Sequence, residues 1–143
     1  IDELQKFKVK IKLISDGDVS GALLVSDPKH ETDIFLGIGG GPEGVLAAAA
    51  LDAFDCHFQA RFLFETDQDK YRAKKMGIKD LTKKYELSEI ISGDSIFCAT
   101  GITSGDLVNG ITIKDNDYSS ETLVTHKSAN LKKIFKKTDT IRL

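Results

Sequence analysis

The sequence has little cysteine, no excess of charge and no long apolar run, and each absence excludes a class of protein. The two cysteines, Cys56 and Cys98, lack the spacing of a metal site, so we interpret them as buried, reduced thiols of a cytoplasmic protein. A net charge of −2 gives no electrostatic case for binding nucleic acid. No apolar run approaches the roughly 20 residues of a membrane span, and no signal peptide is visible, so we expect no membrane association.

The 143 residues are enough for one domain, in which helix and strand patterns alternate. Their order predicts an α/β fold, with a mostly parallel or mixed sheet flanked by helices. Turn residues divide the tail into short strands, which predict antiparallel strands at the C-terminal edge of that sheet. The expected strands are residues 9–14, 33–38, 56–64 and 95–100, and the main expected helices are residues 19–25, 42–52 and 68–76.

The most informative segment is a glycine-rich loop at residues 37–44, which holds five of the chain's twelve glycines. The apolar run before it is typical of a strand, and the alanine-rich run after it is typical of a helix. Such a loop lets a ligand approach the backbone, and the helix start offers free N–H groups to an anion. Glu43 at this helix start either complements the helix dipole or binds a cation.

Gly39, Gly41 and Gly44 also match the GxGxxG fingerprint of dinucleotide-binding domains, with Glu65 following at a suitable distance. Glu43 argues against that interpretation, because it would place a negative charge beside the pyrophosphate. A divalent cation that attracts both groups would remove the objection. A nucleotide-binding Rossmann-like domain therefore stays an alternative, as does a purely structural turn.

Three loops that contain glycine and a carboxylate follow predicted strands: residues 16–18, 37–44 and 100–106. Open α/β sheets bind ligands at the carboxyl ends of their strands, so we expect these loops to form one site. Residues 16–18 could instead cap the following helix, and residues 100–106 could be a structural turn. His57 lies in an expected strand and is predicted to be packed, and no Ser/His/Asp arrangement is apparent.

Taken together, these segments resemble the class II fructose-1,6-bisphosphatases of bacteria, some of which also hydrolyse sedoheptulose 1,7-bisphosphate. The resemblance extends over nearly the whole chain. Its matching pieces are Asp16-Gly17-Asp18-Val19, Gly37-Ile38-Gly39-Gly40, Pro42-Glu43-Gly44-Val45 with the alanine run, Gln59 with Arg61, Met76-Gly77, and the segment from Phe97 to Leu107. The sequence departs from the family at Gly41, where alanine is usual.

The resemblance implies a cytoplasmic phosphomonoesterase of gluconeogenesis that converts fructose 1,6-bisphosphate into fructose 6-phosphate with Mn²⁺ or Mg²⁺. It assigns metal binding to Glu43 and substrate binding to the Asp16-Gly17-Asp18 segment and to Gly40. It implies no further catalytic residue in this chain. The implied partner is the sugar bisphosphate, and we expect a homo-oligomer.

Members of this family are considerably longer than this chain. We therefore expect residues 1–143 to be the C-terminal α/β domain of a two-domain sugar phosphatase, with the N-terminal domain absent. The other metal ligands would belong to that domain, because a hard cation needs several oxygen ligands. The chain alone is expected to be inactive. A non-catalytic sugar-phosphate-binding module is the remaining alternative.

Overall fold

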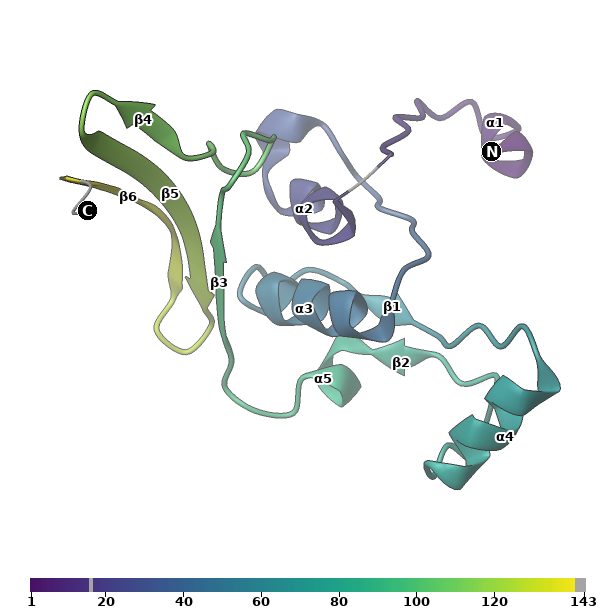
Figure 1. Ribbon diagram of the computed structural model, residues 1–143. Helices are drawn as coiled ribbons and strands as arrows, with labels where there is room; N and C mark the ends of the chain where they lie inside the picture. The colour runs from purple at the N-terminus through teal and green to yellow at the C-terminus, as the bar shows by residue number, and fades with distance from the viewer. Residues whose placement is uncertain (16, 141–143) are drawn as a thin grey trace.

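The computed structural model describes residues 1–15 and 17–140 (Figure 1). Two central helices lie beside a curved sheet, while the first helix and α4 stand away from the rest (Figure 1). The helices are α1 (Asp2–Gln5), α2 (Asp18–Leu23), η1 (Leu24–Ser26), η2 (Pro28–His30), α3 (Gly41–Asp52), α4 (Asp67–Lys75) and α5 (Leu87–Ile90), where η marks a 3-10 helix. The strands are β1 (Gln59–Ala60), β2 (Tyr85–Glu86), β3 (Ile96–Thr100), β4 (Thr112–Lys114), β5 (Asp117–His126) and β6 (Leu131–Thr140).

Both sheets of the described chain are antiparallel throughout. In the larger sheet, β6 pairs with β5 along its whole length, while β3 and β4 share the opposite edge of β5. The smaller sheet consists of β1 and β2 alone. The antiparallel strands expected in the tail are therefore present, but they form the main sheet and not its edge.

The prediction of a mostly parallel or mixed sheet was wrong. Residues 9–14 and 33–38, which we expected as two of its strands, form neither helix nor strand, and residues 56–64 contribute only the two residues of β1. Strand β3, the fourth expected strand, pairs with the antiparallel strand β5. In the predicted parallel sheet, it would instead pair with a strand connected to it through a helix. A strand pattern records only which side chains suit a pleated surface, and a strand exists only where a partner supplies its hydrogen bonds.

Two of the main helices were predicted more accurately than the strands, because helix signals are local. The expected helix at residues 42–52 is α3, and the one at residues 68–76 is α4. A capping box between Thr66 and Asp69 starts α4, and Gly77, at a φ of 96°, follows its end.

The core lies where α3 packs between α2 and the inner face of the large sheet. Ala47, Ala50 and Leu51 of α3 are buried with Phe97 of β3 and Leu123 of β5. Small alanine side chains let the helix approach the sheet closely. The Thr125 hydroxyl, which is fully buried on the same sheet face, donates a 3.5 Å hydrogen bond to the Ala50 carbonyl.

Two predictions of burial were also wrong. Cys98 is exposed, because it lies on the face of β3 opposite to Phe97, and His57 is exposed in an irregular segment. Cys56 is half-buried, and burial together with the Asp55 carboxylate raises the pKa of its thiol. Among the described residues, no helix has the length and apolarity that a membrane span requires.

Candidate functional site

Two of the three predicted loops meet at the starts of α2 and α3. Helix α2 begins directly after Gly17, which has a φ of 83°, and Asp18 is its first residue. A Cβ atom built on Gly39, in the loop before α3, would collide with the Asp18 carboxylate. The absence of a side chain at Gly39 therefore permits the Asp18 carboxylate to lie against this backbone. Asp16, the other carboxylate of the segment, lies outside the described residues.

Glu43 lies in the first turn of α3, and its carboxylate folds back over Gly40, the N-cap residue. A Cβ atom on Gly40 would collide with this carboxylate, whereas one on Gly41 or Gly44 would meet no atom within 4 Å. Gly40 has a φ of −68°, which any residue adopts. The requirement for glycine at this position is therefore one of space beside Glu43, not of backbone conformation.

The helix-capping alternative for residues 16–18 receives no support from Asp18. Gly17 is the N-cap residue of α2, and none of the described side chains caps this helix by a hydrogen bond. The Asp18 side chain is exposed, as is that of Glu43. Each carboxylate lies at a helix start, where the dipole favours negative charge, and each remains accessible to a ligand.

The third loop has the structure of a closed turn. The Glu121 carboxylate accepts hydrogen bonds of 3.0 and 2.9 Å from the backbone and side-chain nitrogens of Asn109, and these two bonds lower its pKa. The Ser104 hydroxyl accepts a 2.9 Å bond from the Gly110 nitrogen. These bonds support the structural interpretation of residues 100–106. Asp106 of this loop also forms a 3.1 Å ion pair with Lys12, which lies in the segment before the first loop.

Glu43 fits a hard divalent cation in the kind of ligand that it offers, because Mg²⁺ and Mn²⁺ prefer carboxylate oxygens. A single carboxylate nevertheless provides too few ligands for such a cation. Among the residues described here, no group of three or more histidine, cysteine or acidic side chains is placed to hold a metal ion. A metal bound by Glu43 would need further oxygen ligands from outside the described part of the chain.

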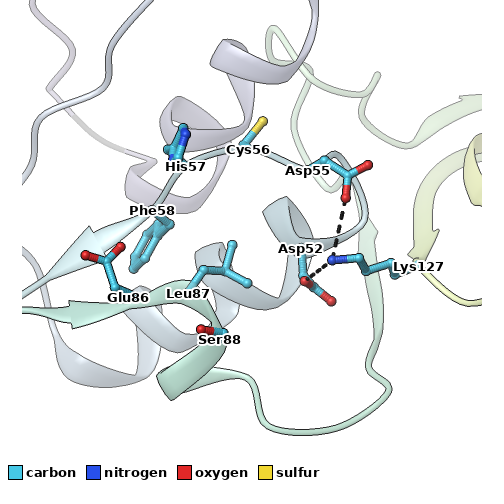
Figure 2. A pocket seen from close by; sticks show the side chains of 9 residues that line it. All are labelled: Asp52, Asp55, Cys56, His57, Phe58, Glu86, Leu87, Ser88 and Lys127. Carbon is cyan, nitrogen blue, oxygen red and sulfur yellow. Dashed lines mark hydrogen bonds and ion pairs between the residues drawn. The ribbon is translucent and has the colours of Figure 1, made fainter.

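An open hollow of about 330 Å³ lies away from these loops, next to the C-terminal end of α3 (Figure 2). Lys127 Nζ lies 3.0 Å from an oxygen of Asp52 and 3.5 Å from one of Asp55, and the two carboxylates raise its pKa. The hollow contains none of the predicted site residues. Lys127 pairs with both aspartates, and the sequence could not indicate its contact with Asp52 because 75 residues separate the two.

The structure also brings together a serine, a histidine and an aspartate that the sequence did not indicate. His126 Nε2 lies 2.8 Å from Asp94 Oδ2 and 2.9 Å from Ser128 Oγ, and this hydroxyl donates a 2.6 Å bond to the same Asp94 oxygen. Both partners contact the same ring nitrogen. A catalytic histidine takes the serine proton on one nitrogen while the carboxylate holds the other, so this cluster is not a hydrolytic triad. It joins the segment before β3 to the β5–β6 turn.

A family model and two similar proteins all relate the chain to the same family. The sequence model of the family described as bacterial fructose-1,6-bisphosphatase, glpX-encoded, matches residues 1–139. The chain is 38% identical over 149 aligned residues to fructose-1,6-bisphosphatase 1 class 2 of Escherichia coli, covering 94% of this chain and 44% of that protein. It is 35% identical over 137 residues to the D-fructose 1,6-bisphosphatase class 2/sedoheptulose 1,7-bisphosphatase of a Synechococcus strain, covering 87% and 40% of the two chains. The chain thus spans less than half the length of these curated relatives.

Proposed function

Because the chain belongs to the family of bacterial class II, glpX-encoded fructose-1,6-bisphosphatases, we propose that it is the C-terminal part of a two-domain enzyme of this kind. The enzyme would hydrolyse the 1-phosphate of fructose 1,6-bisphosphate in the cytoplasm, as a homo-oligomer and with Mn²⁺ or Mg²⁺. The observation that supports this most is the arrangement at the starts of α2 and α3. There, Asp18 lies against Gly39, and Glu43 lies over Gly40.

Each residue has a role that its chemistry suits. The exposed Asp18 carboxylate, with Asp16 and Gly17 of the same segment, would accept hydrogen bonds from sugar hydroxyls and so orient the substrate. Gly40 leaves space for the Glu43 carboxylate beside the backbone, and the free N–H groups of the first turn of α3 would hold the phosphate. Glu43 would supply one oxygen ligand to the metal.

The metal has a clear electrostatic purpose in such a site. Two carboxylates beside a phosphate repel it, and a divalent cation reverses the sign of that interaction. When bound, the metal would polarise the phosphate and lower the pKa of an attacking water. The two alternative functions are treated differently by these findings. Membership of this family gives no support to a nucleotide-binding domain. A non-catalytic sugar-phosphate-binding module would bind the same ligand without hydrolysing it, so a measurement of turnover distinguishes it from the proposed enzyme.

Substitution of Glu43 in the full-length enzyme tests the proposal. Glu43→Gln keeps the size of the side chain and removes its charge, so we expect kcat/KM to fall at least about 100-fold and the Mn²⁺ requirement to rise. Loss of the dipole interaction alone costs roughly 0.3–1 kcal/mol of stability, so the melting temperature should change little.

Glu65→Gln is the matched control, because Glu65 is also exposed and is the acidic residue of the nucleotide-binding alternative. We expect its turnover and metal requirement to equal those of the wild type. Wild-type turnover and an unshifted Mn²⁺ titration for Glu43→Gln would remove Glu43 from the site and contradict the proposal.

A further inference from the structure

The chain exposes far more surface than a typical folded monomer of the same mass. Its accessible surface is 10944 Å², whereas a folded monomer of 15.7 kDa exposes about 7,300 Å². The excess of about 3,600 Å² is several times the roughly 800 Å² that one partner buries in a standard complex. Part of this surface consists of large apolar side chains in the segments before α2 and α3.

Within residues 33–38, one side chain packs against the core and the other residues are exposed. Phe35 is half-buried and packs against the core, while its neighbours Ile34 and Leu36 are 74% and 69% exposed. An uninterrupted apolar run of this kind is typical of a strand covered on both faces, so the sequence suits a covering layer that the described residues do not provide.

Residues 9–14 reach the same point of α2 through Ile14, and they too include exposed apolar side chains. Ile14 and Phe35 both contact α2 at Gly21, where a Cβ atom would overlap both side chains. Leu13 is 72% exposed. Within the described part of the chain, the backbone of residues 9–14 and 33–38 makes no hydrogen bond to another backbone group. These backbone groups are open to pairing with another strand.

We propose that residues 9–14 and 33–38 form an interface that the remainder of the same enzyme covers, with a strand of that remainder hydrogen-bonded to them. This inference rests on the proposed function for the identity of the occupant. The curated relatives contain more than half of their length beyond the matched region, which supplies an occupant of sufficient size. The excess surface exceeds what a standard interface between two folded partners buries. It fits two parts of one folding unit.

A substitution in the full-length enzyme tests this interface without requiring the short chain to fold. Leu36→Lys would place a charge in a covered apolar contact, so we expect the melting temperature to fall by at least about 5 °C. Tyr71→Lys is the matched control, since Tyr71 is 67% exposed on the charged helix α4 and should remain so. Equal melting temperatures for both variants and the wild type would show that Leu36 is uncovered and overturn the proposal.

Hydrogen exchange provides a second measurement on unmodified protein. In the full-length enzyme, we expect the amides of residues 9–14 and 33–38 to exchange about as slowly as those of α3. Exchange of both segments at least about 100-fold faster than that of α3 would overturn the proposal. So would protection that disappears when the full-length enzyme is diluted until sedimentation shows a monomer, because a second copy would then be the occupant. Both readouts measure burial and not turnover, so the interface and the enzymatic proposal can fail separately.

Discussion

Replacement of Gly40 by alanine tests the site by moving the Glu43 carboxylate while keeping its charge. Gly40 has φ and ψ values of −68° and 154°, which alanine adopts without strain. The new methyl group would instead occupy the place where the Glu43 carboxylate lies. This carboxylate is the end of a flexible side chain, so it can move away while the backbone of α3 stays in place. In the full-length enzyme, the substitution should therefore displace Glu43 and leave the fold intact.

The size of the effect follows from the overlap. To reach an ordinary van der Waals separation, the Glu43 oxygen must retreat by more than about 1 Å. A misplacement of about 1 Å in a catalytic arrangement can lower the rate about 100-fold, which corresponds to roughly 2.7 kcal/mol of activation free energy. Stability should change less, since alanine in place of an N-cap glycine costs at most about 1 kcal/mol.

The measurement is kcat/KM of the full-length enzyme over a Mn²⁺ titration, together with thermal melting. Gly41→Ala is the control one residue away, because a Cβ atom there meets nothing within 4 Å and alanine favours the first turn of the helix. We expect wild-type activity and up to about 1 kcal/mol of added stability for this control. If Gly40→Ala and Gly41→Ala turn over equally well, the reasoning that places Glu43 in the site is refuted.

Three further predictions concern the substrate, the isolated chain and acid stability. Asp18→Asn in the full-length enzyme should lower kcat/KM at least about tenfold with unchanged melting, because charged hydrogen bonds to sugar hydroxyls contribute about 1.5–3 kcal/mol; unchanged kinetics would contradict this role. The 143-residue chain alone should release no phosphate from fructose 1,6-bisphosphate above background with Mn²⁺, because its metal ligands are incomplete, and clear turnover by the pure chain would disprove this. The Ser128 hydroxyl and the His126 ring lower the pKa of Asp94, so the folded carboxyl binds its proton more weakly than the unfolded one. The stability from this group should be present above about pH 4 and be lost as the pH falls through the lower folded pKa, so Asp94→Asn should flatten the decline of melting temperature below pH 4, and an unchanged slope would argue against it.

The sequence by itself determined the features that depend on neighbouring residues. Pro42 and the alanine run specify the start and length of α3, and the Thr66–Asp69 capping box specifies the start of α4. The order of the motifs was sufficient to indicate the family, because each motif requires particular residue types at a fixed spacing. The residues of the candidate site were predicted from the family resemblance, and Glu43 also from its place at a helix start.

The tertiary structure decided what depends on residues far apart in the chain. Residues 33–38 have the composition of a strand, but no partner pairs with them in the described chain, so the parallel sheet expected from the sequence is absent. The 100–106 loop has the composition of a ligand loop, but Asn109 and Glu121 close it as a turn. Composition records what a segment can do, and its partners determine which of these possibilities occurs.

The candidate site shows the same division. The sequence identified Asp18, Gly40 and Glu43 as separate points on two loops. Only the folded chain brings the Asp18 carboxylate against Gly39 and turns the Glu43 carboxylate back over Gly40. The physical reason is that a residue's helix or loop preference is a property of a few adjacent bonds, whereas the distance between two loops is set by the packing of α2 and α3 on a shared core.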